Sequence, residues 1–175
     1  MINIAINYIF IATFSVLLII AAIKDARQFI IPNWLPASLT MLFLLAVGFG
    51  WTQEISLFPT SLWLHILTMA GVLIFFTILF ATGQMGGGDV KLIAAVSLWA
   101  GPYYVFDFIL ITALAGGVIA AIQLIRGGMQ KKSIANYTGD DLQQNEQAVQ
   151  KAVPYGIAIG FGGIFCAQQL LNQFN

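Results

Sequence analysis

The sequence predicts an all-α polytopic membrane protein that forms a single domain over residues 1–175. The first observation is the composition: 59% of the residues are hydrophobic, 8% are charged and the mean hydropathy is +0.89, which is too apolar for a soluble domain. The second is that apolar residues gather into runs of about 20, the length that crosses a bilayer as a helix. The chain opens on such a run without a basic stretch or a small-residue cleavage site, so we expect it to be retained as the first span.

Six transmembrane segments are expected, of which the fourth is short. Four clear runs lie at residues 4–23, 62–81, 103–125 and 153–171. The segment 33–50 is slightly shorter and contains Pro36, but its Leu, Met and Phe residues favour a crossing with an irregular start. The segment 90–99 has a length typical of a re-entrant helix, and Gly101-Pro102 ends it abruptly.

The Lys and Arg residues indicate the orientation of these segments, because basic residues gather in short cytoplasmic loops. They follow the first, third and fifth segments, at Lys24, Arg27, Lys91, Arg126, Lys131, Lys132 and Lys151. Six crossings with the N-terminus outside place all of them in the cytoplasm, whereas a fourth segment that dips and returns loses this agreement. Asp25 and Asp89 are then both expected at the cytoplasmic face of the membrane.

The segment 126–152 is rich in Gln and Asn and lacks apolar periodicity over its first half. This pattern is typical of a mobile cytoplasmic loop, with a short helix possible at residues 140–151. The seven basic residues balance seven acidic ones and form no basic cluster, so nucleic-acid binding has no electrostatic support. Cys166 is the single cysteine, which excludes an internal disulfide and a four-cysteine metal site.

Asp25 and Asp89 need an explanation, because acids are costly at the edge of a bilayer. Taken alone, Asp25 fits an interfacial charge neutralised by Lys24 and Arg27, and Asp89 fits a helix cap. Taken together, they lie at equal depth on one face and can share a proton. One carboxyl then polarises a carbonyl oxygen while the other activates a water, as in aspartyl proteolysis. No metal or other cofactor is needed for this chemistry.

Glycines and two further motifs surround these acids. Gly86, Gly87 and Gly88 precede Asp89, and they leave room for an extended substrate strand and allow positive φ angles. Their spacing matches neither a phosphate-binding loop nor a dinucleotide fingerprint. Near the other acid stands the run Ile31-Pro32-Asn33, whose simplest interpretation is a helix start. The run Pro154, Tyr155 and Gly156 opens the last segment on the same face, and our hypothesis is that it lines the cleft and orients the substrate backbone.

In this order, these motifs resemble the type IV prepilin peptidase family, the GxGD-type intramembrane aspartyl peptidases. The resemblance covers Asp25 ahead of the Ile-Pro-Asn run, the motif GGGDVKL at 86–92 and the run KAVPYGIAIGFGG at 151–163. It implies that Asp25 and Asp89 are the catalytic pair. The reaction it implies is hydrolysis after a glycine that ends a short basic leader, just before the hydrophobic helix of a prepilin or pseudopilin substrate. The enzyme would lie in the bacterial inner membrane with its active site on the cytoplasmic side.

Larger members of that family carry a cytoplasmic extension with paired cysteines and also methylate the new amino terminus with S-adenosylmethionine. Here the first loop is short and contains no cysteine. The chain therefore resembles the small peptidases of tight-adherence (Flp-type) pilus systems, which implies peptidase activity alone. Archaeal preflagellin peptidases are near neighbours that share the motifs. The sequence gives no indication of the oligomeric state.

Two other classes of function remain open from the residues alone. The acids could carry protons or cations in a small transporter, but the spans hold no carboxylates at mid-depth to continue such a path. A non-catalytic pilus assembly factor could bind pilin helices through its glycine-rich faces, but binding alone would not require a pair of acids.

Several other side chains have structural interpretations. Lys91 is expected to point away from Asp89 and to anchor its helix at lipid head groups. His65 is expected to be neutral and bonded to a neighbouring helix. The remaining glycines of the spans are interpreted as sites of close helix contact, namely Gly71, Gly116, Gly117, Gly160, Gly162 and Gly163.

Overall fold

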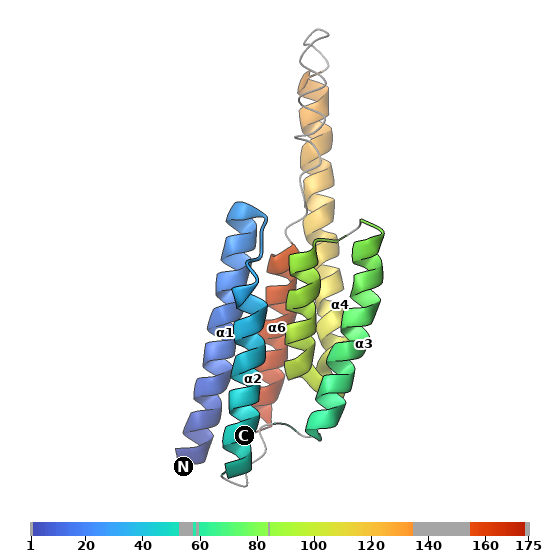
Figure 1. The fold of residues 1–175 in the computed structure, drawn as a ribbon. Coiled ribbons are helices and arrows are strands. Elements are labelled where there is room, and N and C mark those ends of the chain that lie inside the picture. The colour runs from blue at the N-terminus through green and yellow to red at the C-terminus, as the bar shows by residue number, and fades with distance from the viewer. Residues whose placement is uncertain (1, 53–57, 59, 84, 135–154, 174–175) are drawn as a thin grey trace.

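The computed structural model describes the chain except for residues 1, 53–57, 59, 84, 135–154 and 174–175. The described residues form helices and no strands, which confirms the all-α prediction (Figure 1). The helices pack side by side as a bundle, and both termini lie at the same end of it. The helices are α1 (Ile2–Gln28), α2 (Trp34–Thr52), α3 (Leu62–Ala81), α4 (Gly87–Ile134) and α6 (Tyr155–Asn172).

Helix α4 is two arms that meet at a sharp reversal. Gly101 has φ 58° and ψ −170°, a conformation that glycine adopts readily, and Pro102 follows it. The first arm, 87–100, runs toward the end that holds the termini, and the second arm, 102–134, runs back and projects beyond the bundle (Figure 1). The segment 126–134, which the sequence assigns to the mobile loop 126–152, instead continues this arm as helix. The remainder of that loop, with its possible helix at 140–151, lies outside the described residues.

His65 of α3 stabilises this reversal. The Leu98 carbonyl would ordinarily accept a hydrogen bond from the N–H of residue 102, which is a proline and has none. His65 Nδ1 donates to that carbonyl at 2.8 Å, and the Thr60 hydroxyl, 2.8 Å from Nε2, donates to the other ring nitrogen. The side chain is 1% exposed. The predicted bond of His65 to a neighbouring helix is confirmed.

An aromatic core joins α1, α2 and the first arm of α4. The Phe14 and Trp99 rings stack with their centroids 4.5 Å apart, and the Phe43 ring meets Trp99 edge-on at 5.8 Å. Trp99 Nε1 also donates to the Leu39 carbonyl at 3.0 Å, so the polar edge of the indole is satisfied. Each aromatic pair contributes about 0.5–1.5 kcal/mol beyond the burial of its area. These contacts hold the three helices in fixed register.

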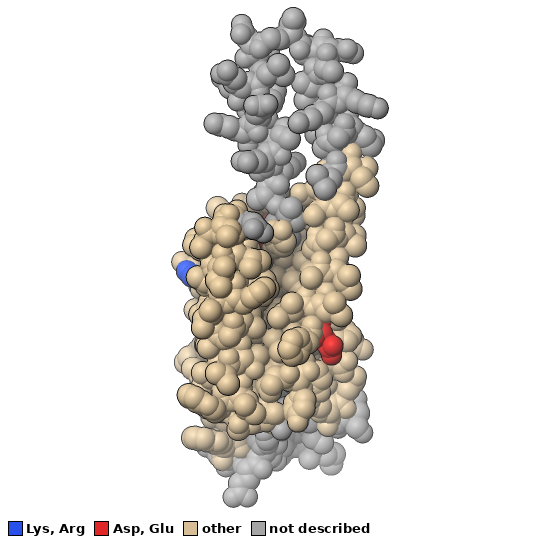
Figure 2. Space-filling view, turned by 90° about the vertical axis from the view of Figure 1, so that its right-hand side faces the viewer, with Lys and Arg blue, Asp and Glu red and all other residues tan. Residues whose placement is uncertain are grey.

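Four helices of the described chain are long and apolar enough to cross a membrane, which supports an all-α membrane protein but not six spans. The stretch in α4 includes the fourth predicted segment and most of the fifth, while α6, the sixth, is not among the four. One face of the bundle is almost free of charged side chains (Figure 2), as lipid contact requires. The qualifying stretches are Ile6–Gln28, Trp34–Trp51, Leu62–Ala81 and Gly87–Gln123.

Candidate functional site

Asp25 lies near the end of α1 and its side chain is buried, with 4% of its surface exposed. Its Oδ2 accepts a hydrogen bond of 2.6 Å from the backbone N–H of Gly156. Gly156 is the second residue of α6, where backbone N–H groups have no partner within the helix and carry a partial positive charge. The carboxylate of Asp25 therefore caps a helix that is remote in sequence.

The approach of Asp25 to α6 depends on glycine. A Cβ at Gly156 would lie 2.7 Å from the Cβ of Asp25 and 2.8 Å from its Oδ2, closer than real Cβ atoms come. The same face of α6 continues with Gly160, where a Cβ would lie 3.3 Å from the Cβ of Ala22, and Gly163 meets Leu18. Close helix contact at Gly160 and Gly163 was predicted and is confirmed.

Asp89 is the third residue of α4 and is partly buried. The first helical hydrogen bond runs from the Val90 N–H to the Gly86 carbonyl at 3.2 Å, so Gly86 is the residue that precedes the helix. The carboxylate of Asp89 folds back toward Gly86, the residue before the helix. A Cβ at Gly86 would lie 3.0 Å from Asp89 Oδ2. An acid at the third position of a helix that folds back toward the preceding residue is one half of a capping-box arrangement; Gly86 has no side chain to supply the other half.

The other two glycines of this motif contact the protein itself. A Cβ at Gly87 would lie 3.3 Å from the Phe80 ring of α3, and one at Gly88 would lie 3.1 Å from the carbonyl oxygen of Ile31. None of residues 86–88 has a positive φ, so the backbone freedom that glycine allows is not used at these positions. The absent side chain of Gly88 lets the turn between α1 and α2 approach the start of α4, and that of Gly87 makes room for α3. Their predicted role in substrate binding is not tested by these contacts.

The Ile-Pro-Asn turn is tied to α4 by a second contact. Lys91 Nζ donates a hydrogen bond of 2.9 Å to Asn33 Oδ1. Lys91 was expected to anchor its helix at lipid head groups, and the structure gives it a protein partner instead. Because Gly88 meets Ile31 and Lys91 meets Asn33, the run 31–33 fixes the position of the first turn of α4, which carries Asp89.

Both acids therefore lie at one end of the bundle, where α1 ends and α4 and α6 begin; we call this the acid end. They are close enough for the charge of Asp25 to act on Asp89. The sequence motifs that contain them are brought together by the contact of Gly88 with Ile31, the hydrogen bond from Lys91 to Asn33 and the hydrogen bond from Gly156 to Asp25. Within the described ranges, no group of three or more His, Cys, Asp or Glu side chains is arranged to hold a metal ion.

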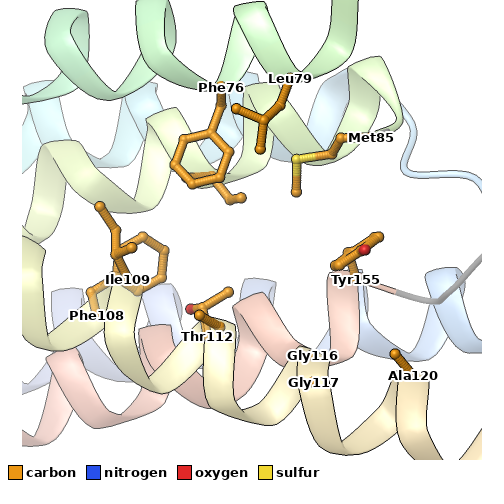
Figure 3. Close-up of a pocket in the computed structure, with 12 residues that line it drawn as sticks. Phe76, Leu79, Met85, Phe108, Ile109, Thr112, Gly116, Gly117, Ala120 and Tyr155 are labelled. Atoms are coloured by element: carbon orange, nitrogen blue, oxygen red, sulfur yellow. The ribbon is translucent and has the colours of Figure 1, made fainter. Parts of the chain in front are cut away.

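A cavity of about 310 Å³ opens beside the acid end, between α3, the two arms of α4 and the start of α6 (Figure 3). Met85 and Ile93, which stand four residues before and after Asp89, contribute to its wall. Tyr155, the residue before Gly156, forms another part, and its ring lies 3.6 Å from where a Cβ of Gly116 would be. Pro154, the third residue predicted to line a cleft here, lies outside the described residues.

Sequence reasoning missed the far wall of this cavity, which the second arm of α4 supplies. In the sequence, this wall is marked by the pair Gly116 and Gly117, which was interpreted as a site of close helix contact. Gly116 does contact Tyr155, but a Cβ at Gly117 would meet nothing within 4 Å, so that interpretation is wrong for Gly117 and equally for Gly71. Gly117 faces open space because it lines the cavity.

Comparison with known proteins agrees with this arrangement. The family model described as the type IV leader peptidase family matches residues 12–121, which is more than half of the chain and includes both acids and the glycine motif. Neither a curated protein nor a solved structure matches the chain. On the strength of the family match, the chain belongs to the type IV leader peptidase family and is a multi-pass membrane peptidase.

Proposed function

We propose that this protein is an intramembrane aspartyl endopeptidase that removes the basic leader from type IV prepilin-like precursors, with Asp25 and Asp89 as its catalytic pair. The observation that carries the proposal is that these two acids lie at the same end of the bundle, each at a contact between helices. They are distant in sequence, lie on different helices and come close enough to interact electrostatically at one end of the bundle. Both also lie within the stretch that matches the leader peptidase family.

The surroundings of the acids suggest different roles in the reaction. Two carboxylates that repel each other share one proton, so one is ionised and the other is protonated. Burial opposes ionisation of Asp25, and both acids lie at the N-terminus of a helix; we assign the ionised form to Asp25 because it also accepts the 2.6 Å hydrogen bond from the Gly156 N–H. Asp25 would remove a proton from a water, while the protonated Asp89 would donate to the carbonyl oxygen of the scissile bond. Collapse of the resulting tetrahedral intermediate transfers a proton to the departing amine.

The proposed topology has six crossings with the N-terminus outside. The reversal at Gly101 makes the two arms of α4 antiparallel (Figure 1), so the helices of the described residues, with α4 taken as two arms, form six rods of alternating direction. Such alternation places both termini at one end and both acids at the other, and the projecting second arm of α4 extends from the acid end. With the basic residues inside, the acid end faces the cytoplasm of a bacterium, where a leader peptide would remain.

Supporting residues of the substrate cleft are proposed around the acids. Gly86, Gly87 and Gly88 shape the approach to Asp89, and Gly156 and Tyr155 link Asp25 to the neighbouring cavity. Pro154 joins this set on sequence grounds. The turn between α1 and α2 covers residues 29–33 and contains no cysteine, so we propose a peptidase of the small, tight-adherence type without methyltransferase activity.

The test is cleavage of a candidate precursor that is co-reconstituted with the enzyme in lipid vesicles. Asp25→Asn and Asp89→Asn keep the side-chain shape but remove the shared proton, and each should lower the cleavage rate by about 10²–10⁴-fold, the usual contribution of a catalytic acid or base. The matched control is Asp107→Asn, because Asp107 is exposed on the second arm of α4 and is distant in sequence from both acids.

Normal cleavage by either variant, with wild-type insertion and folding, would contradict the proposal for that residue. If Asp89→Asn still processes the precursor, its carboxylate is a helix cap only. A non-catalytic assembly role, with the cleavage performed by another protein, would then account for the family motifs.

A further inference from the structure

The cavity beside the acid end takes no part in the proposed acid–base chemistry. Its walls come from α3, from both arms of α4 and from α6, and they are almost entirely apolar (Figure 3). Along the second arm of α4 the wall runs from Ala120, near the acid end, down to Phe108. At about 1.5 Å per residue this is a surface roughly three turns of helix in length.

The second arm presents small residues to this cavity. Ala113, Gly116, Gly117 and Ala120 all line it, and Gly117 has open space where its Cβ would be. Small residues on a membrane helix allow a second helix to approach its backbone closely. A flexible acyl chain has no need of such a surface, so the wall favours a helical peptide as the occupant.

Thr112 provides an independent observation on the same wall. Its side chain is 9% exposed, and its hydroxyl has no hydrogen-bond partner among the described residues. Other threonines of the bundle behave differently: the Thr68 and Thr77 hydroxyls each donate to a carbonyl one turn earlier in their own helix. An unpaired buried hydroxyl costs about 1–3 kcal/mol.

The Thr112 hydroxyl now packs against Gly162, where a Cβ would overlap it. Thr112 also lines the cavity, and because threonine populates two side-chain rotamers in a helix, we infer that exchange between them brings the hydroxyl to the cavity wall. A peptide helix that has been opened for cleavage exposes N–H groups in its first turn, and these need an acceptor. Thr112 lies four residues along the arm from Gly116, so it is about one turn deeper than Tyr155 and Gly156.

We propose that this cavity is the docking groove for the apolar helix that follows the scissile bond of the precursor, with Thr112 accepting an N–H from its first turn. This inference rests on the proposed function, because it places the scissile bond at the acid end. The groove then selects substrates by the fit of their apolar segment against the small residues of α4. In this proposal, residues of α3 and of the second arm of α4 also determine substrate specificity.

The first experiment fills the groove. Gly117→Leu adds a side chain where the cavity is open, and its matched control is Gly71→Leu, which also has open space on a membrane helix but does not line the cavity. Gly117→Leu should raise the KM for the membrane-embedded precursor by about tenfold or more and change kcat little, whereas the control should stay near wild type. An unchanged KM in Gly117→Leu would overturn the docking groove.

A cross-linking measurement does not depend on cleavage. In the Asp89→Asn background, Gly117→Cys and Gly71→Cys are each paired with a precursor that carries one cysteine in the first turns of its apolar segment. The native Cys166 is buried and common to both variants. Disulfide formation at position 117 but not 71 supports the groove. Absence of cross-links at 117 assigns the cavity to lipid and overturns the proposal, even if both aspartates prove catalytic.

The role of Thr112 is tested separately. Thr112→Val removes the hydroxyl and keeps the shape, and it should lower kcat/KM severalfold while Thr112→Ser restores it. Thr77→Val is the control, because its exposed hydroxyl bonds within its own helix. If Thr112→Val cleaves like wild type, the hydroxyl is no acceptor for the substrate and the polar part of the proposal fails.

Discussion

The two ends of the bundle differ in whether their polar groups are hydrogen-bonded within the protein. At the reversal around Gly101, the orphaned carbonyl of Leu98 is bonded by His65, whose other nitrogen is bonded by Thr60. At the acid end, two carboxylates that repel each other lie next to an apolar cavity whose Thr112 hydroxyl is unpaired within the described chain. One end satisfies its polar groups internally, and the other leaves them available.

This difference separates structural polar groups from groups that are available for chemistry. A histidine inside a membrane helix and an aspartate at its edge both attract a functional interpretation from sequence. His65 has both ring nitrogens bonded within the protein. Asp25 has one oxygen bonded to Gly156 and a second acid nearby. Polar groups whose arrangement departs from the most stable packing tend to mark functional sites.

The largest effect is expected at the structural end, from Gly101→Ala. The new Cβ would overlap the His65 ring and the residue would have to hold φ 58°. Backbone strain of about 1–3 kcal/mol at this glycine-only conformation and overpacking of about 1–3 kcal/mol together predict a loss of about 3 kcal/mol or more in the free energy of unfolding. Thermal unfolding in lipid nanodiscs measures it. Gly48→Ala, with no neighbour within 4 Å in α2, is the control and should not destabilise the protein.

At the acid end, Gly156→Ala should damage catalysis more than stability. The added methyl forces Asp25 away from α6, and a displacement of about 1 Å of a catalytic group costs about 100-fold in rate. The comparison is Gly160→Ala, on the same face of α6 but against Ala22 rather than the acid. Precursor cleavage and unfolding are measured on both. Equal rates in the two variants would show that the contact of Asp25 with α6 does not position it.

Much of this fold can be predicted from the local sequence, and α3 is an example. Its bounds, 62–81, are those that the apolar run predicts, because nothing but hydropathy decides where it begins and ends. The placement of both acids at one end also follows from the alternation of apolar runs and basic loops. The continuation of α4 as helix to Ile134 could not be anticipated, because that stretch has no apolar periodicity to mark it.

The candidate site was predictable only in part, as the glycines show. Gly160 and Gly163 contact α1, whereas Gly71 and Gly117 face open space, yet all four are single small residues in apolar helices. Sequence does not indicate which face of a membrane helix meets a neighbour when every face is apolar. For the same reason, the cavity and the contact of Lys91 with Asn33 depend on how the helices pack.

A smaller loss of stability is expected from His65→Phe, which keeps the aromatic packing but leaves the Leu98 carbonyl and the Thr60 hydroxyl without the ring nitrogens. The free energy of unfolding should fall by about 1–3 kcal/mol, the cost of leaving such groups unpaired. Cleavage by the folded protein should remain at the wild-type rate. A selective loss of cleavage without a loss of stability would mean that His65 acts as a proton relay, and the contrast between the two ends would fail.

The smallest effect is expected from Lys91→Met, which removes the hydrogen bond to Asn33. The bond is exposed and contributes about 0.5–1 kcal/mol, so kcat/KM should fall by about two- to fivefold through a looser position of Asp89. Asn33→Ala should have a similar effect. Because both changes break one bond, the double variant should be no worse than either single one, as a double-mutant cycle measures. Additive losses would show that Lys91 and Asn33 act separately, and the acid end would then be positioned by Gly88 and Gly156 alone.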